Sequence, residues 1–364
     1  MNILIVKLSA IGDVIHTLPS LSALRRRYPD AHITWVVEEA ASDLILGHPD
    51  LNRVIVSRRK RWVRDLPGER RGAAWKEMRQ FVRELRDCSY DLVIDFHGLF
   101  KSAAIVFLSG GRRKLGFDSM QELSSLFYSE KIPEDMSRHA VDRYLDFVRY
   151  LGADPGTPQF VIPVDGENRA RAGDLLKEAG IGSGKGFVAV SPQALWETKL
   201  WEDEKFAHLC DCIVLGLKRP VVFTGSDANA VERIRTLMGA PSVSLAGRTT
   251  LRDLACVYRR AALLVTTDSG PMHLAAAVKT PVVALFGPTD PGRTGPYGEG
   301  HVILRREMNC SPCFAKKCDT RKCMTGISAD EVFEAVRGKL SEIGAGCVRI
   351  ANGPEGIACT GSGS

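Results

Sequence analysis

Residues 263–286 read LLVTTDSGPMHLAAAVKTPVVALF, a stretch in which two kinds of pattern alternate. Its first five residues form an uncharged, partly β-branched run that is typical of a buried strand. Pro271 suits the first position of a helix, helical positions continue from Met272, and a second apolar run follows at 281–286. Two such runs joined by a helix predict neighbouring parallel strands.

Short apolar runs of the same kind recur along most of the chain and are separated by amphipathic helical stretches. This alternation predicts an α/β fold in which parallel strands are buried on both faces, most simply as two Rossmann-like, doubly wound domains. The expected strands occupy residues 2–8, 32–37, 53–56 and 90–95 in the first half, and 187–191, 220–224, 263–267 and 281–286 in the second.

Turn-forming residues at 154–158 and 180–186 place the seam between the two domains at 161–185. We therefore expect an N-terminal domain over 1–165 and a C-terminal domain over 166–325. A capping box at 328–331 predicts a final helix over 326–343. The Gly- and Ser-rich tail, 344–364, has too little apolar content to pack, and we expect it to be disordered.

The composition of the 364 residues is that of a globular protein, with 45% hydrophobic and 25% charged residues. No uncharged apolar run approaches the roughly 18–20 residues that a membrane span needs. Lys7 and Asp13 interrupt the apolar N-terminal stretch and no basic region precedes it, so we expect a cytoplasmic protein rather than a signal peptide. A secreted disulfide scaffold would be shorter and richer in cysteine than this chain.

The net charge of +6 is unevenly distributed. Between residues 58 and 71 only Asp65 and Glu69 are acidic, while seven residues are basic: Arg58, Arg59, Lys60, Arg61, Arg64, Arg70 and Arg71. Such a segment attracts phosphates, an anionic membrane surface or nucleic acid. The alternative is an ordinary solvated helix or loop face.

The first expected strand leads into the sequence KLSAIGDVIHTLP at 7–19. Ligands of open α/β sheets bind at the carboxyl ends of strands, so Asp13 stands where a functional carboxylate would be placed. The loop lacks G-x-G-x-x-G, which argues against a dinucleotide enzyme of the usual kind. The alternative for Asp13 is the N-cap of the following helix. His16 and Thr17 belong to the same site or face solvent.

The turn after the strand at 263–267 is the strongest local signal. The amides of Ser269 and Gly270 would point outward at a helix N-terminus, which is a natural seat for a phosphate. Asp268 fits there as a ligand of a ribose hydroxyl or as an organiser of the backbone. Lys199, in the loop after the strand at 187–191, could reach an anion on these amides. The alternative is a capped turn with nothing bound.

Four of the ten cysteines lie within 14 residues, namely Cys310, Cys313, Cys318 and Cys323. Four thiols suit a tetrahedral structural zinc site, although the spacing between the pairs is shorter than in the common zinc patterns. Reduced or paired thiols are the main alternative, and a redox function is a third. None of these alternatives makes the cysteines catalytic.

Five motifs in this order resemble the lipopolysaccharide heptosyltransferases, and the resemblance spans roughly residues 1–343. They are KLSAIGDVIHTLP at 7–19, DFHGLFKS at 95–102, KLW at 199–201, DSGPMHLA at 268–275 and FGPTDP at 286–291. The segments WVVEE at 35–39, RW at 61–62 and SLFY at 125–128 are most similar to the heptosyltransferase I branch. These enzymes are inverting glycosyltransferases of GT-B architecture.

The resemblance implies that the donor is ADP-L-glycero-β-D-manno-heptose and the acceptor is Kdo of the lipid A inner core. It implies that Asp13 is the general base and that no cofactor or catalytic metal is required. It gives the donor site as Lys199, Thr249, Asp268, Ser269, Gly270 and His273. Because the acceptor is anionic, the candidate acceptor contacts are Arg58, Arg59, Lys60, Arg61, Arg64 and Lys101. The partners implied are the donor, the lipid acceptor and the cytoplasmic face of the inner membrane, but no nucleic acid.

The chain departs from the family pattern at several positions. His97 stands where relatives have Gln, Ser269 replaces a common Thr, and Glu202 replaces a proline. The ribose-binding acidic residue does not align cleanly, and Asp227 or Glu232 could substitute for it. A sister enzyme with another acceptor or nucleotide sugar, such as heptosyltransferase II, is the first alternative. A non-catalytic anion-binding module is the second.

Overall fold

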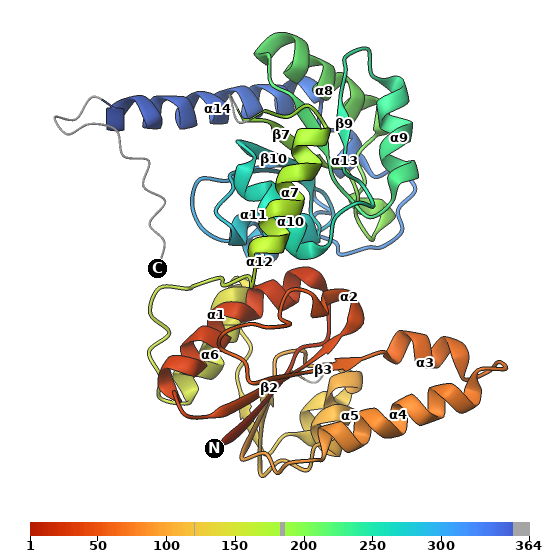
Figure 1. The fold of residues 1–364 in the computed structure, drawn as a ribbon, viewed down its shortest axis with the longest axis vertical. Coiled ribbons are helices and arrows are strands. Elements are labelled where there is room, and N and C mark those ends of the chain that lie inside the picture. Colours follow the sequence, from red (N-terminus) through yellow and green to blue (C-terminus); the bar gives the residue numbers. More distant parts are fainter. Residues whose placement is uncertain (120, 183–185, 352–364) are drawn as a thin grey trace.

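The computed structural model describes residues 1–119, 121–182 and 186–351 of the chain. These residues form two parallel sheets, each with helices on both faces, and the two resulting domains lie one above the other in Figure 1. The predicted α/β class with two doubly wound units is therefore confirmed.

The first sheet has six strands in the order β3-β2-β1-β4-β5-β6. Along β1, Ile3 and Ile5 enter one buried cluster while Leu4 and Val6 enter another on the opposite face. Burial on both faces explains why this strand is a continuous apolar run. The strands are β1 (Asn2–Val6), β2 (His32–Glu38), β3 (Arg53–Ser57), β4 (Leu92–Asp95), β5 (Arg113–Phe117) and β6 (Glu130–Ile132).

Two layers of helices cover the first sheet. One face carries α1 (Ile11–Arg27), α2 (Glu39–Ser42) and α6 (Ala140–Tyr150). The other carries α3 (Arg59–Asp65), α4 (Arg71–Leu85), α5 (Phe100–Leu108) and the 3-10 turn η1 (Gln121–Phe127). In Figure 1, α3 and α4 project from the lower domain on the right.

The second sheet has six strands in the order β12-β11-β10-β7-β8-β9. They are β7 (Val188–Ser191), β8 (Val221–Phe223), β9 (Val243–Ser244), β10 (Leu263–Thr267), β11 (Val282–Phe286) and β12 (Val302–Arg305). The face toward the first domain carries α7 (Gly166–Glu178), α10 (Leu251–Arg260) and α11 (Gly270–Ala277). The opposite face carries α8 (Asp203–Leu217), α9 (Ala228–Leu237), α13 (Lys322–Thr325) and α14 (Ala329–Ala351). Two short turns, η2 (Glu197–Lys199) and α12 (Pro291–Thr294), follow strands β7 and β11.

The chain passes from the first domain to the second between α6 and α7, and we keep residue 165 as the proposed boundary. The capping box before α14 is present, since the Ser328 N–H donates to Glu331 at 2.9 Å and the Glu331 N–H donates to Ser328 Oγ at 3.2 Å. The helix begins at Ala329 and continues to Ala351, beyond the expected end at 343. Residues 352–364 of the expected tail lie outside the described residues.

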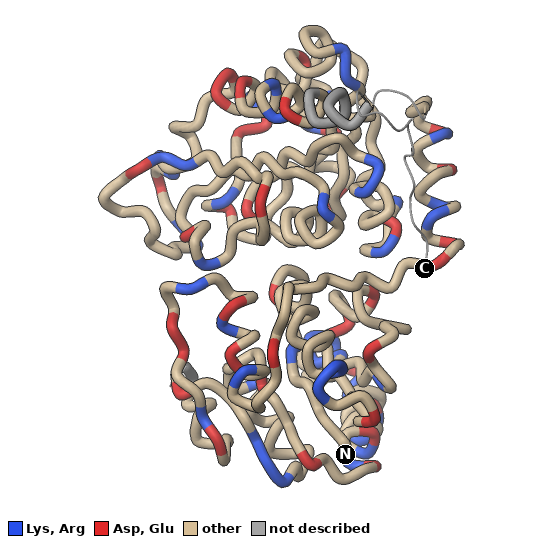
Figure 2. The backbone as a smooth tube through the Cα atoms, turned by 90° about the vertical axis from the view of Figure 1, so that its left-hand side faces the viewer, with Lys and Arg blue, Asp and Glu red and all other residues tan. Residues whose placement is uncertain are grey.

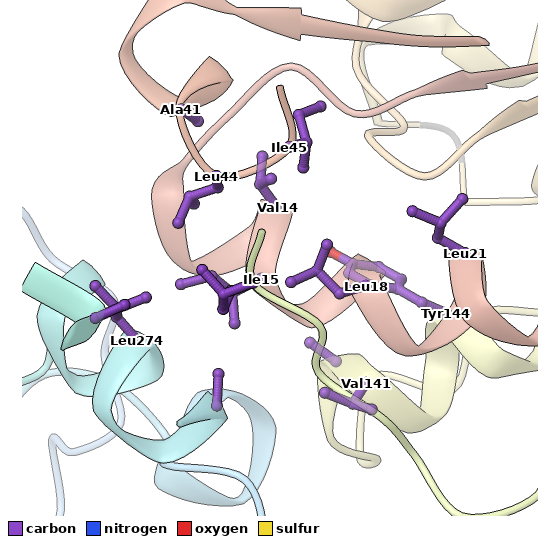
Figure 3. Packing of buried hydrophobic residues seen from close by; sticks show 14 of the residues in the cluster. Val14, Ile15, Leu18, Leu21, Ala41, Leu44, Ile45, Val141, Tyr144 and Leu274 are labelled. Carbon is purple, nitrogen blue, oxygen red and sulfur yellow. The ribbon is translucent and has the colours of Figure 1, made fainter. Parts of the chain in front are cut away.

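One buried cluster runs through both domains. Ile15 of α1 and Leu274 of α11 both belong to it, and Figure 3 shows Ile15 on the side of α1 that faces Leu274. The carboxyl ends of the two sheets therefore meet where the N-termini of α1 and α11 meet. Within the described residues, no helix is both long enough and apolar enough to cross a bilayer.

Candidate active site

Asp13 lies in the first turn of α1, close to the carboxyl end of β1. Its Oδ2 accepts a hydrogen bond from the backbone N–H of Ala10 at 2.9 Å. The N-cap alternative is wrong in detail, because Ala10 holds that position and Asp13 is three residues farther on. The half-buried carboxylate thus closes the first turn of α1, directly after Gly12, which lies against the second domain.

Lys7, which follows the end of β1, is a buried lysine of the same loop. Lys7 Nζ donates to the Phe96 carbonyl at 2.8 Å and to the Tyr144 hydroxyl at 2.6 Å. Burial lowers the pKa of Lys7, and the negative charges of Asp13 and Asp95 oppose that shift. Lys7 is therefore held by two hydrogen bonds, and its electrostatic environment includes Asp13.

Gly12 allows α1 to touch α11. A Cβ at this position would lie 2.3 Å from Cδ2 of His273, so only glycine fits without a shift. One turn later, His16 Nε2 lies 2.9 Å from His273 Nδ1. The His139 ring packs edge-on against His16 with a centroid distance of 5.1 Å, and its Nε2 lies 3.1 Å from the Gly295 carbonyl oxygen. Three histidines from both domains therefore meet at the interface.

The two contacting imidazoles are neutral near pH 7. Burial lowers the pKa of His273 to about 4, although the charges of Asp268 and Asp13 act in the opposite direction. Burial, and then the neighbouring His273, lower the pKa of His16 well below its ordinary value. The pair can therefore share one N–H···N hydrogen bond without burying a positive charge.

Asp268 and Lys199 form an ion pair at the carboxyl ends of β10 and β7. Lys199 Nζ lies 2.6 Å from Asp268 Oδ2, and the Thr289 hydroxyl donates to the same oxygen at 2.6 Å. Both charged side chains are largely buried, and Lys199 also lies 4.5 Å from the centre of the Trp196 ring. The Asp268 carboxylate thus contacts both the Lys199 ammonium and the Thr289 hydroxyl.

The N-terminus of α11 opens beside that ammonium. Ser269 is the N-cap residue, and Pro271 occupies the first turn as expected. The backbone N–H groups of Ser269 and Gly270 donate to no described residue. Two backbone amides without a described partner, at a helix N-terminus next to a lysine, suit the oxygens of a phosphate.

At the adenosine end of the expected donor site, the acidic candidates for a ribose contact are already engaged in local interactions. Thr249 is half-buried, two residues after Gly247, whose N–H donates to the Gly225 carbonyl at the end of β8. The Asp227 carboxylate caps α9 by accepting from two backbone N–H groups. Glu232 pairs with Arg235 at 2.7 Å. Both acidic candidates for a ribose contact thus already have local structural roles.

The basic candidates of the first domain separate into two groups. Arg59, Lys60 and Lys101 converge on the buried carboxylate of Glu38 at 3.4, 3.6 and 3.7 Å. Lys101 also donates to Ser9 Oγ at 3.2 Å, which places this group close to the α1 turn.

The other three basic candidates pair with acidic residues of the first domain other than Glu38. Arg58 pairs with Glu39 at 3.1 Å and Arg61 with Glu77 at 2.6 Å, while Arg64 pairs with Asp65 at 2.8 Å. The structure therefore brings together only part of the basic run that the sequence singled out.

The four clustered cysteines line a cavity of about 40 Å³ together with Thr198. None is in a disulfide, and Cys310, Cys313 and Cys318 are exposed. Within the described part of the chain, no three His, Cys, Asp or Glu side chains are grouped as a metal ion requires. The segment instead supports the η2 turn, because Thr198 Oγ1 donates to the Ala315 carbonyl at 2.8 Å.

Sequence reasoning missed Lys7, Glu38, His139, Tyr144 and Thr289 as members of the site. A charged residue next to a buried strand was the available signal for Lys7, and Thr289 lies within the quoted FGPTDP segment. The contacts of His139 and Tyr144 depend on packing between residues far apart in the chain, and no local pattern reveals them.

The chain is similar to known proteins in sequence and in fold. A family profile described as glycosyltransferase family 9 (heptosyltransferase) matches residues 78–324. The chain is 33% identical over 321 residues to lipopolysaccharide heptosyltransferase 1 of Pseudomonas aeruginosa, with 87% of each chain covered. It is 26% identical over 289 residues to lipopolysaccharide heptosyltransferase 3 of Escherichia coli, with 77% of this chain and 81% of that protein covered.

Solved structures show the same fold. A family 9 glycosyltransferase from Veillonella parvula superposes with a TM-score of 0.82 and 26% identity, covering 94% of this chain and 97% of that one. The E. coli heptosyltransferase WaaC with ADP gives a TM-score of 0.75 and 28% identity, covering 93% and 100%. The matched profile and these neighbours establish that the chain belongs to glycosyltransferase family 9, the heptosyltransferase family.

Proposed function

We propose that this protein is a lipopolysaccharide heptosyltransferase of type I. It would transfer heptose from ADP-L-glycero-β-D-manno-heptose to Kdo of the lipid A inner core, with inversion at the anomeric carbon. The observation that carries the proposal is that the Asp13 turn meets the α11 N-terminus, so a carboxylate and an anion seat share one interface. The related WaaC structure with ADP-2-deoxy-2-fluoro heptose, at 26% identity, supports this donor class.

Asp13 acts as the general base in this proposal. As the acceptor hydroxyl attacks the anomeric carbon, its proton passes to the Asp13 carboxylate and a new C–O bond forms. The bond between the anomeric carbon and the diphosphate oxygen breaks on the opposite side, and ADP leaves with the electron pair. A positioned base of this kind typically contributes about 10²–10⁴-fold to the rate.

The donor phosphates bind at the amides of Ser269 and Gly270 and at Lys199. Negative charge on the leaving diphosphate grows in the transition state, and donors that are already in place stabilise it without reorganisation. Asp268 holds the lysine in place through a short, buried ion pair, and Thr289 in turn donates a hydrogen bond to Asp268. His273 closes the seat on the side of α1, and Thr249 is the proposed neighbour of the adenine.

The acceptor binds on the first domain, where its carboxylates and phosphates meet basic side chains. Arg59, Lys60 and Lys101 are the best placed, because they lie on the same side as Ser9 and the Asp13 turn. The lipid acceptor also implies peripheral contact with the cytoplasmic face of the inner membrane. We propose no nucleic-acid partner and no required cofactor.

A heptosyltransferase acting on a later acceptor is the second candidate. It is favoured by the 26% identity to a protein named lipopolysaccharide heptosyltransferase 3, which matches most of this chain. A non-catalytic anion-binding module is the weaker alternative, because a carboxylate at the mouth of a phosphate seat would serve no purpose there.

The test measures ADP release from ADP-heptose with Kdo2-lipid A for the wild type, Asp13→Ala and Asp13→Asn. The asparagine variant can still accept the Ala10 N–H, so it keeps the helix cap while losing the base. We expect acceptor-dependent release by the wild type and a loss of at least about 10²-fold in both variants. Wild-type activity of Asp13→Asn would show that Asp13 only caps the helix, and it would contradict the mechanism.

Two further outcomes distinguish the alternatives. Release only with another acceptor would assign the protein to a sister activity with the same machinery. Binding of ADP-heptose that Lys199→Ala abolishes, without turnover on any acceptor, would favour the binding module. Absence of both turnover and donor binding would overturn the heptosyltransferase assignment.

A further inference from the structure

The charge of this protein is concentrated in one helical hairpin. Residues 58–86 contain 11 basic and four acidic side chains, a net charge of +7, whereas the whole chain carries +6. Outside these residues the charges balance, and Figure 2 shows Lys and Arg interspersed with Asp and Glu over the upper domain. The hairpin, built by α3 and α4, also projects from the body of the lower domain (Figure 1).

The side chains of α4 are sorted around its axis into three faces. Ala74, Phe81 and Leu85 pack into the core, following a spacing of i, i+7 and i+11. The acidic residues share a second face, where Gln80 donates to Glu84 at 2.8 Å and Glu77 pairs with Arg61.

The third face combines basic and apolar side chains, and we call it the α4 outer flank. It consists of Trp75, Lys76, Arg79, Val82, Arg83 and Arg86. Trp75, Arg79, Val82, Arg83 and Arg86 are spaced i, i+4, i+7, i+8 and i+11, so they line one side of the helix.

The α4 outer flank is free to bind a partner. Its four basic residues, Lys76, Arg79, Arg83 and Arg86, are exposed and form no ion pair with any described residue. Trp75 is 54% exposed. Between the charged side chains lies a shallow hollow of about 340 Å³, lined by Trp75, Met78, Arg79, Val82 and Arg83.

We propose that the α4 outer flank is a membrane-docking surface that binds anionic phospholipids. Arginine and lysine contact the headgroup phosphates, and Trp75 inserts at the level between headgroups and acyl chains. A surface helix with a basic face and a tryptophan beside it suits that interface. The indole ring of tryptophan has an apolar body and a polar N–H, so it is compatible with both the acyl chains and the headgroups. An acidic protein partner would leave an exposed Trp75 without a comparable role.

The biological role of this docking surface rests on the proposed function, because a lipid-linked acceptor is the reason for the protein to bind a membrane. The basic group on Glu38 lies at the other end of the hairpin region, closer to the Asp13 turn. A protein held by α4 at a leaflet would keep the mouth of its site near a lipid-linked acceptor. Vesicle binding by the α4 outer flank needs neither donor nor acceptor and is measured in their absence.

The experiment measures co-sedimentation of the full chain with vesicles of phosphatidylethanolamine and phosphatidylglycerol, and with phosphatidylcholine vesicles. We expect binding to the anionic vesicles only, weakening as salt is raised. The double variant Arg79→Glu/Arg83→Glu should bind at least about 25-fold more weakly, because each basic side chain near an anionic leaflet contributes roughly fivefold.

A matched control removes the same charge elsewhere. Lys177→Glu/Arg259→Glu changes two exposed basic residues on α7 and α10 that also form no ion pair with a described residue. We expect wild-type vesicle binding from this control. Equal losses in both double variants would show a general charge effect and overturn the docking surface.

Trp75 provides an independent readout. Vesicles should shift the tryptophan emission of the wild type to shorter wavelength, and Trp75→Ala should lack that component although four other tryptophans remain. Unchanged emission with bound vesicles would contradict insertion of Trp75. Binding of the flank to single-stranded RNA but not to anionic vesicles would assign it to a nucleic acid and overturn the proposal.

Failure here can be separated from failure of the proposed function. If Arg79→Glu/Arg83→Glu loses vesicle binding but still turns over a water-soluble, delipidated acceptor, both proposals stand. If the wild type binds vesicles but has no transferase activity, only the proposed function fails. If it turns over the soluble acceptor but binds no anionic vesicle, only the docking surface fails.

Discussion

Gly12 is the residue on which the contact between the two domains depends most directly. Because a Cβ at this position would lie 2.3 Å from the His273 ring, Gly12→Ala should force α1 and α11 apart. We expect a loss of about 10-fold or more in kcat/KM, since small misplacements of catalytic groups are costly. The matched control is Gly72→Ala in α4, where nothing lies within 4 Å of the added Cβ. Wild-type kinetics in Gly12→Ala would contradict the close approach.

His273 makes stability depend on pH. Its pKa is lowered from 6.5 to about 4 by burial, so the unfolded chain binds a proton at a pH where the folded protein does not. The free energy of unfolding should therefore fall as pH drops from about 6.5 towards 4, by up to roughly 3 kcal/mol from this group. Urea titrations at several pH values should show a flatter profile for His273→Gln. Parallel profiles for the two proteins would contradict the shift.

The sequence predicted the members of the site that stand at strand ends. Asp13, Lys199 and Asp268 follow apolar runs, and the topology of an α/β fold alone puts such residues at one edge of a sheet. The contact of His16 with His273 joins residues 257 positions apart, and no local pattern encodes that contact. Glu38 was missed for a similar reason, since its role arises only when three basic side chains converge on it.

At the scale of elements, the eight expected strands are all present and four others were not expected. The strands that the sequence did not predict are β5, β6, β9 and β12. Three of them, β6, β9 and β12, lie at an edge of a sheet. An edge strand is not enclosed by neighbours on both sides, so it needs no continuous apolar run. Sequences such as RKLGF at 113–117 and EKI at 130–132 carry charges that hide the strand from a search for apolar runs.

The η2 turn gives a prediction about an element. Thr198 Oγ1 donates to the Ala315 carbonyl, which ties the turn bearing Lys199 to the cysteine segment. Thr198→Val keeps the shape but removes this hydrogen bond, at a cost of about 0.5–1.5 kcal/mol. We expect calorimetry to show donor binding weakened by about 2–10-fold. Thr236→Val removes a comparable bond on α9 and should leave donor affinity unchanged. Equal affinities in both variants would contradict the supporting role of the segment.

At the scale of the whole molecule, two polar contacts flank the meeting of α1 and α11. On one side the Asp43 carboxylate pairs with Arg252 of α10 at 3.4 Å and accepts a hydrogen bond from the Arg252 backbone N–H at 3.1 Å. On the other, the Tyr297 hydroxyl donates to Asp142 of α6 at 2.9 Å. Enzymes of two domains complete their site by closing, and contacts of this kind favour the closed arrangement.

Asp43→Ala combined with Tyr297→Phe should therefore shift the protein towards open forms. The lost contacts contribute roughly 1–2 kcal/mol together, so the closed population falls by about 5–30-fold relative to the open one. Small-angle X-ray scattering should report a larger radius of gyration, and kcat/KM should fall while the thermal unfolding of each domain is retained. Glu130→Ala/Tyr150→Phe is the matched control, because it removes an ion pair and a tyrosine hydrogen bond within the first domain alone. An unchanged radius together with an unchanged rate would mean that the buried packing of α1 on α11, and not these two polar contacts, holds the domains together.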